Sequence, residues 1–207
     1  MQFQILWVNE TNKEDPRLQY DNVIGIPAIF EDTWYDNRPY QIWRGSRFSS
    51  KSWTKALQFL LKPEYQKFFR GVFTRNTHKS ARDSQFQLFK DLLKRYPALG
   101  EKWEIKEYSM TLIHKDTGFF IKGGSFENSD DLLSVPEITD VWAEEPISRT
   151  GSIKRTDFEN ITGTMRNSEG VDPIFHFTFN PIGKGTSYMK IFMMKKRRNT
   201  TTMNFAI

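Results

Sequence analysis

Eight residues at positions 45–52, with the sequence GSRFSSKS, constrain the fold of this chain more than any other segment. They follow a short apolar stretch at 40–43 and open a segment, 51–61, whose apolar side chains recur at helical spacing. A strand that turns directly into a helix directs several backbone N–H groups and the positive end of the helix dipole toward one point. This arrangement suits a di- or triphosphate, although a serine-rich N-cap on an ordinary helix would explain the same residues.

Two side chains in this segment carry the chemistry that a phosphate loop needs. Lys51 would supply a positive charge to the β- and γ-phosphates, and the Ser52 hydroxyl would ligate Mg²⁺. The segment departs from the pattern G-x-x-x-x-G-K-[ST] at one position, because Ser50 stands where the second glycine is expected. Glycine is favoured there because the backbone approaches phosphate closely and no Cβ is in the way.

A second candidate group is the acid pair Glu144 and Glu145, which follows the apolar stretch 138–143. A nucleotide hydrolase needs one carboxylate to hold Mg²⁺ through water and another to activate the attacking water. Ligands of open parallel sheets bind at the carboxyl ends of the strands, where this pair is expected. Asn180 follows another apolar stretch, 172–179, and its amide could bond a γ-phosphate or the attacking water. Surface glutamates and a strand-ending Asn-Pro turn are the alternatives.

Strand-like and helix-like segments alternate along the chain, which predicts an α/β fold with crossover connections and a mostly parallel sheet. The length of 207 residues suffices for one such domain. Residues 103–113 and 118–122 are expected to form a hairpin. Strands are expected near residues 3–8 and at 40–43, 68–73, 103–113, 118–122, 138–143 and 172–179, and helices at 51–61, 80–96, 130–135, 153–165 and 186–196.

Composition excludes several kinds of site. The chain has no cysteine and only three histidines, far apart, so disulfides, thiol chemistry and a histidine-based metal site are not expected. Neither a membrane span nor a signal peptide is visible. The net charge of +5 is unevenly spread, with ten basic residues and two acids at 44–83, seven acids and no base at 125–145, and five bases at 190–198. A charge run is usually a solvated face, but together these blocks favour an anionic partner.

Five motifs in order give the chain a resemblance to a known family. They are WRGSRFSSKSW, VFTRNTHKSARDSQFQLFKDLL, IKGG, ITDVWAEEP and FTFNP. Together they resemble the ATPase domain of the large terminase subunit of tailed bacteriophages, in particular the PBSX-like group. The resemblance extends from about residue 34 to residue 192. It implies a P-loop NTPase fold (ASCE/RecA-like), with a central mostly parallel β-sheet flanked by helices.

The resemblance also implies roles for individual residues. Lys51 and Ser52 would bind phosphate and Mg²⁺, Glu144 would be the Walker B acid at the metal, and Glu145 would be the catalytic glutamate. Arg47 would be an arginine finger supplied from the same chain, a kind of residue that contributes about 10³–10⁵ in turnover elsewhere. The residues expected to bind ATP are Gly45, Ser46, Arg47, Phe48, Ser49, Ser50, Lys51, Ser52 and Asn180.

Further residues are weaker candidates on the same resemblance. Thr178 and Asn180 would form a motif that couples hydrolysis to motion. An aromatic group just before the first core strand would lie where family members contact the base, although packing explains it equally well; its members are Trp34, Tyr35, Arg38 and Tyr40. The cations Arg75, Arg149 and Arg166 could contact phosphate or a neighbouring subunit, but each is more often structural.

As implied by the resemblance, the chain would hydrolyse ATP to move double-stranded DNA into a procapsid in the host cytoplasm. Its partners would be DNA, the portal protein, the small terminase subunit and further copies in a ring, with a monomer expected in isolation. The expected organisation is an N-terminal, adenine-side extension at 1–39, a P-loop core at 40–196 and, at 197–207, the start of a linker to a nuclease domain. The alternatives are a helicase-like motor, a non-enzymatic DNA-binding or assembly module and, less favoured, a small-molecule kinase.

Overall fold

The computed structural model describes residues 2–146, 153–180 and 200–205, which form an α/β domain around one eight-stranded sheet. The sheet order is β10-β3-β9-β8-β4-β7-β6-β5, and the pairs from β10 to β7 are all parallel. The strands of this sheet are β3 (Tyr40–Gly45), β4 (Arg70–Arg75), β5 (Trp103–Lys106), β6 (Thr111–His114), β7 (Phe120–Ser125), β8 (Asp140–Glu144), β9 (Ile174–Phe179) and β10 (Thr200–Phe205). The predicted α/β class with a mostly parallel sheet is therefore confirmed.

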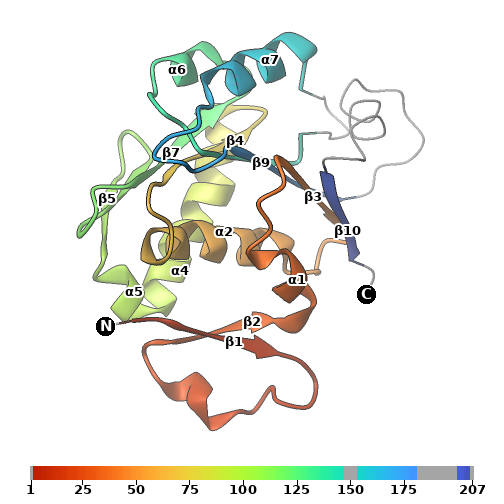
Figure 1. The fold of residues 1–207 in the computed structure, drawn as a ribbon, viewed down its shortest axis with the longest axis vertical. Coiled ribbons are helices and arrows are strands. Elements are labelled where there is room, and N and C mark those ends of the chain that lie inside the picture. The colour runs from red at the N-terminus through yellow and green to blue at the C-terminus, as the bar shows by residue number, and fades with distance from the viewer. Residues whose placement is uncertain (1, 147–152, 181–199, 206–207) are drawn as a thin grey trace.

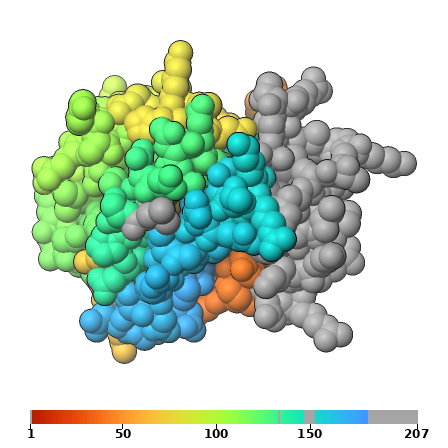
Figure 2. Space-filling view, turned by 90° about the horizontal axis from the view of Figure 1, so that it is seen from above, coloured from red at the N-terminus to blue at the C-terminus, as the bar shows by residue number. Residues whose placement is uncertain are grey.

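Helices cover both faces of the sheet (Figure 1). One face carries the helices of the first half of the chain, and a separate parallel ribbon of β1 (Gln4–Val8) and β2 (Val23–Pro27) lies on the side of these helices away from the sheet. The helices there are α1 (Glu31–Trp34), α2 (Lys51–Leu61), α3 (His78–Ala81), α4 (Gln87–Arg95) and α5 (Pro97–Gly100). The other face carries α6 (Asp130–Leu133) and α7 (Arg155–Thr164), as Figure 1 shows, and their residues form part of the surface seen in Figure 2. Short helical turns are η1 (Pro16–Gln19), η2 (Ala28–Phe30) and η3 (Lys62–Glu64).

Two hydrophobic clusters fill the space on either side of the sheet, because side chains of a strand point alternately to opposite faces. In β8, Trp142 belongs to the cluster under α2 and α4, whereas Val141 and Ala143 belong to the cluster under α6 and α7. In β3, Trp43 likewise belongs to the first cluster and Ile42 to the second. No helix in the described part of the chain is long and apolar enough to cross a bilayer.

The predicted helix at 80–96 is longer and less regular than expected. It begins at His78, where Thr77 and Ser80 form a capping box, and it ends at Arg95 before Pro97. Between α3 and α4, the segment η4 (Arg82–Phe86) is a π-helix. Helical periodicity predicts where a helix lies but not a change in the number of residues per turn.

The predicted two-stranded hairpin is a three-stranded antiparallel unit in the structure. Residues 103–113 form two strands, β5 and β6, which are antiparallel and joined by a turn in which Met110 has φ 47°. β6 then pairs antiparallel with β7 across the expected second turn. β2 was not predicted at all, because VIGIP is short and contains both glycine and proline.

The segment predicted to begin a linker, 197–207, contains a strand of the main sheet. Residues 200–205, which fall in the predicted linker at 197–207, form β10 and pair parallel with β3 along its whole length, from Tyr40 to Gly45. A strand at the edge of a sheet is defined by its distant partner and not by its own sequence, so TTTMNF gave no local signal. The predicted helix at 186–196 and the basic block at 190–198 lie outside the described residues.

Candidate active site

The predicted phosphate loop joins the end of β3 to the start of α2. Lys51, the first residue of α2, is buried and turns its ammonium group back into the loop. Lys51 Nζ donates to the carbonyl oxygens of Gly45 (3.0 Å) and Ser46 (2.8 Å) and to Ser49 Oγ (2.8 Å). The loop is therefore closed around its own lysine, and the ammonium group occupies the centre of the turn.

Ser50 takes the backbone conformation for which glycine is favoured. Its φ is 57° and its ψ is 11°, in the left-handed region, and its carbonyl oxygen accepts the first α2 hydrogen bond from Thr54 N at 2.9 Å. A serine thus adopts the left-handed conformation that glycine favours, at a backbone cost of about 1–3 kcal/mol. The other side chains at the tip of the loop point outward, since Arg47 is exposed and Phe48 is 90% exposed.

The acid pair lies at the carboxyl end of β8, as predicted. Glu144 is buried, and two side chains from neighbouring elements contact the same carboxylate oxygen, Oε2. Ser84 Oγ, in η4, donates to it at 2.9 Å, and Arg75 Nε, at the end of β4, lies 3.4 Å from it. Glu144 is therefore held from the side away from the phosphate loop.

Glu145 leaves the strand with an unusual backbone. Its φ is 48°, and its N–H donates to the carbonyl oxygen of Thr178 in β9 at 2.8 Å. Non-glycine residues in this region are strained, and such strain gathers at functional sites. The turn separates the directions of two adjacent carboxylates, which gives each a different environment.

Asn180, one residue beyond β9, joins the loop to the acid pair. Its Oδ1 lies 3.4 Å from Lys51 Nζ, and its Nδ2 donates to Glu145 Oε1 at 2.8 Å. This contact is possible because β9 lies between β3 and β8 in the sheet. Thr178 plays a different part, since its Oγ1 accepts from Trp142 Nε1 at 2.7 Å inside the core.

Burial sets the electrostatics of the two groups that Asn180 joins. Burial, and then the nearby charge of Glu144, raise the pKa of Glu145 above its ordinary value, although Arg75 and Lys51 oppose the shift. Burial lowers the pKa of Lys51, against the pull of the two glutamates. A carboxylate whose pKa is raised toward neutrality is better able to accept a proton from water.

The donor set fits Mg²⁺ held jointly with a nucleotide. Among the described residues, no three His, Asp or Glu side chains cluster as a metal cage. Mg²⁺ in proteins commonly has one or two protein oxygen ligands and completes its shell with phosphates and water. Glu144 and the Ser52 hydroxyl, in the first turn of α2, are residues of the required type at the two sides of the site.

Several weaker candidates lie elsewhere. Of the proposed base-contacting group, Trp34 is 1% exposed and packs edge-on against Trp7, and Tyr35 packs edge-on against Tyr65. Arg38 pairs with Asp36. These residues precede β3, whose other end leads into the phosphate loop, and their contacts are ring packing for Trp34 and Tyr35 and a salt bridge for Arg38.

Of the three cationic candidates, the structure brings one into the site. Arg75 lies in the site, through its contact with Glu144. Arg166 donates to the carbonyl oxygens of Gly163 and Met165 at the end of α7, and Arg149 lies outside the described residues. Sequence reasoning did not single out Ser84, and the only available signal was its place in the motif VFTRNTHKSARDSQFQLFKDLL.

A phosphate loop between a strand and a helix, with an acid pair at the end of a nearby parallel strand, defines a P-loop NTPase. The sequence profile of the family described as phage terminase large subunit matches residues 37–205, and the chain belongs to this family. No curated protein sequence matches the chain.

Solved structures show the same fold at low sequence identity. The large terminase of bacteriophage HK97 superposes with a TM-score of 0.65 at 14% identity, over 97% of this chain and 40% of that one. The large terminase of a thermophilic bacteriophage, solved in complex with ADP, gives 0.60 at 16%, over 84% and 43%. An ATPase-domain mutant from Thermus phage P74-26 gives 0.64 at 14%, over 93% and 85%. The chain thus has the fold of a large-terminase ATPase domain and spans about two fifths of the longer terminases.

Proposed function

We propose that this domain binds ATP with Mg²⁺ and hydrolyses it to ADP and phosphate. One observation carries the proposal: the contacts from Lys51 through Asn180 to Glu145 join the phosphate loop to the acid pair within one connected group. An ordinary helix cap with surface glutamates would have no reason to be connected in this way. The similar large terminase that was solved in complex with ADP supports the choice of nucleotide.

Each residue of this group has a distinct task. Lys51 and the backbone N–H groups of the loop bind and orient the phosphates. Mg²⁺, when bound, neutralises charge on the β- and γ-phosphates, and Ser52 and Glu144 would hold it. Glu145 accepts a proton from water, and Asn180 keeps the Glu145 carboxylate turned toward the phosphate side of the site. Arg47, which is exposed in the loop, would reach the phosphates from the solvent side as an arginine finger.

A cavity beside the first turn of α2 is our candidate for the nucleoside. It has a volume of about 750 Å³ and lies between the β1–β2 ribbon, α2 and the end of α4. Aromatic and polar groups line it, which suits stacking and hydrogen bonding to a base; they include Tyr20, Ser50, Trp53, Arg95 and Tyr96. This location agrees with an adenine-side role for the N-terminal segment, but through residues 8–27 and not through Trp34 and its neighbours.

At the level of the whole protein, we propose that ATP turnover by this domain drives translocation of double-stranded DNA into a procapsid. Family membership supports this role. The portal protein, the small terminase subunit and further copies of the chain in a ring would be its partners, in the host cytoplasm. Binding to DNA would fall steeply with salt, because phosphate contacts release counterions.

Binding and turnover of Mg-ATP, measured separately on three proteins, test the ATPase proposal. Lys51→Ala should lose nucleotide binding, since the loop then lacks its cation. Glu145→Gln should keep binding but lose about 10²–10⁴ in turnover, the usual contribution of a general base. Glu137→Gln, an acid from the same acidic stretch that pairs with Arg70 at the amino end of β4, is the matched control and should behave as wild type.

A wild-type protein that binds no Mg-ATP at millimolar concentration would contradict the proposal and favour the assembly module. Equal turnover by wild type and Glu145→Gln would leave nucleotide binding in place but remove the catalytic role of the acid pair.

A further inference from the structure

Two residues outside the phosphate loop and the acid pair contact one oxygen of the Glu144 carboxylate. Oε2 accepts a hydrogen bond from Ser84 Oγ at 2.9 Å and lies 3.4 Å from Arg75 Nε. The two donors come from different elements, η4 and β4, and meet at the end of β8. A buried carboxylate with both contacts on one oxygen has a fixed orientation, since rotation would break them.

The π-helical geometry of η4 brings Ser84 to this position. A π turn takes more residues than an α turn, so consecutive side chains diverge less around the helix axis. Ser84 reaches Glu144, and Gln85 Nε2 next to it lies 3.3 Å from the carbonyl oxygen of Trp142 in the same strand. Two consecutive helix residues thus contact β8 two residues apart, with Phe86 fully buried behind them.

A further contact fixes the start of η4 to the turn between β5 and β6. The Arg82 guanidinium donates to the carbonyl oxygens of Glu107 (2.9 Å) and Tyr108 (3.0 Å), in the turn between β5 and β6. The segment is therefore held both by β8 and by the β5–β6 turn, without any ligand. A group held in this way can orient a metal ligand without reorganising on binding.

We propose that Ser84 is a positioning residue for Glu144: with Arg75 it holds Oε2, so that Oε1 is presented to the hydrated Mg²⁺ of the bound nucleotide. This inference rests on the proposed ATPase function and adds a residue outside the phosphate loop and the acid pair. Partners of metal ligands contribute about 10–100-fold to metal affinity in other proteins.

Metal binding distinguishes this role from general support of the fold. Mn²⁺ prefers oxygen ligands as Mg²⁺ does, and the free ion can be counted by electron paramagnetic resonance. Each protein is saturated with a non-hydrolysable ATP analogue and titrated with Mn²⁺. Ser84→Ala should weaken Mn²⁺ binding by about tenfold, while nucleotide binding in the presence of a chelator stays as in wild type.

Two variants complete the design. Ser84→Thr keeps a hydroxyl at the same position and should restore Mn²⁺ affinity to within about twofold of wild type. Ser80→Ala removes a serine one turn earlier, where the hydroxyl caps α3 and makes no contact with Glu144. It should lower the melting temperature but leave Mn²⁺ affinity unchanged.

A second readout uses turnover as a function of Mg²⁺. Ser84→Ala should require more Mg²⁺ for half-maximal turnover, with most of the maximal rate recovered at saturating Mg²⁺. Equal Mn²⁺ affinity in wild type and Ser84→Ala, or the same loss in Ser80→Ala, would overturn the positioning role and leave the ATPase proposal intact. Absence of nucleotide binding by the wild-type protein would instead overturn the ATPase proposal itself.

Discussion

Ser50 has a strained backbone at the position where the phosphate-loop pattern has glycine. With φ 57° it occupies the left-handed region without the freedom of glycine. Ser50→Gly should therefore stabilise the protein by about 1 kcal/mol. It should also tighten nucleotide binding, because no Cβ remains at the phosphate side of the loop. Chemical denaturation and nucleotide titration measure the two effects.

Glu169 provides the matched control for this substitution. It has φ 54°, is exposed, and lies before β9 at the amino edge of the sheet, away from the loop. Glu169→Gly should give a similar gain in stability with no change in nucleotide affinity. If both variants changed affinity alike, the effect of Ser50→Gly would be one of global stability and not of the loop.

Asn180 is the residue whose contacts join the two halves of the site. Asn180→Ala removes the bond to Glu145 and the contact with Lys51. Turnover should fall about 10²-fold or more, since the base loses its orientation, whereas nucleotide affinity should change much less. Steady-state kinetics and direct binding separate these quantities. Asn167→Ala, which removes a surface bond to Asp172, should leave both unchanged, and a similar loss there would contradict the assignment.

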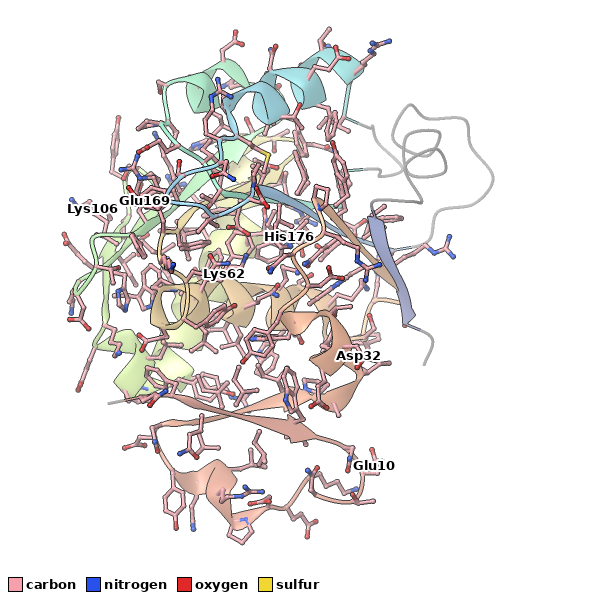
Figure 3. The ribbon with its side chains drawn as sticks, viewed as in Figure 1. Glu10, Asp32, Lys62, Lys106, Glu169 and His176 are labelled. Carbon is pink, nitrogen blue, oxygen red and sulfur yellow. The ribbon has the colours of Figure 1, made fainter. Side chains whose placement is uncertain are left out.

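At the scale of elements, a buried polar network ties α2 to the sheet. Lys55 Nζ contacts Gln41 Oε1 in β3 (3.0 Å) and His176 Nδ1 in β9 (3.1 Å). His176 Nε2 lies 2.8 Å from Asp140 Oδ1 in β8, and Lys62, just beyond α2, pairs with the same carboxylate. Figure 3 shows His176 and Lys62 inside the molecule, between sheet and helix, whereas Glu10 and Lys106 lie at its periphery. The helix that begins with Lys51 is thereby fixed to the strands that end at the site.

This network makes stability depend on pH in a defined direction. Burial and the nearby Lys55 lower the pKa of His176 well below its ordinary value, so the folded protein keeps it neutral. As the pH falls below about 6.5, the unfolded chain takes up a proton that the folded chain does not, and stability decreases by up to about 1.4 kcal/mol per pH unit. His114, whose pKa burial also lowers, adds to the same loss.

Denaturation at pH 7.5, 6.5 and 5.5 measures this slope. His176→Gln should be less stable at pH 7.5 but should show a shallower loss toward pH 5.5, because one of the two contributing histidines is gone. At lower pH a further loss is expected as Asp140 is protonated. Burial alone would raise the pKa of Asp140, but Lys62 and His176 lower it to about 2. An unchanged slope in His176→Gln would contradict this account.

At the scale of the whole molecule, β10 protects the strand that leads into the phosphate loop. It pairs with β3 from Tyr40 to Gly45, so β3 is not an edge strand. Removing residues 200–207 would expose the backbone groups of β3, and exposed edges favour association. The melting temperature should fall by several degrees, at about 2–4 °C for each kcal/mol in a chain of this size, and light scattering should detect oligomers.

Removing only Ala206 and Ile207 keeps β10 and is the control for this truncation. It should melt as the full chain does and remain monodisperse. An unchanged melting temperature and a monomeric state after removal of residues 200–207 would show that β10 is dispensable for the fold.

The sequence predicted those elements whose signals are local. α2 begins at Lys51 and ends at Leu61, as the sequence predicted. Its buried face could be recognised because its own apolar side chains recur at helical spacing. The positions of Lys51, Glu144 and Asn180 at strand and helix ends followed from apolar runs that end in polar residues. Family resemblance then gave these residues their proposed roles.

Other parts of the fold and the site depend on residues far apart in the chain. Ser84 and Glu144 are sixty positions apart, and no local pattern reports the hydrogen bond between them. The same holds for the edge strand β10 and for the π turn of η4. The sequence by itself therefore determined which residues could perform the chemistry. Only the tertiary structure decided which of them meet, because the order of parallel strands, and hence the neighbours of each strand end, is set by packing across the whole sheet.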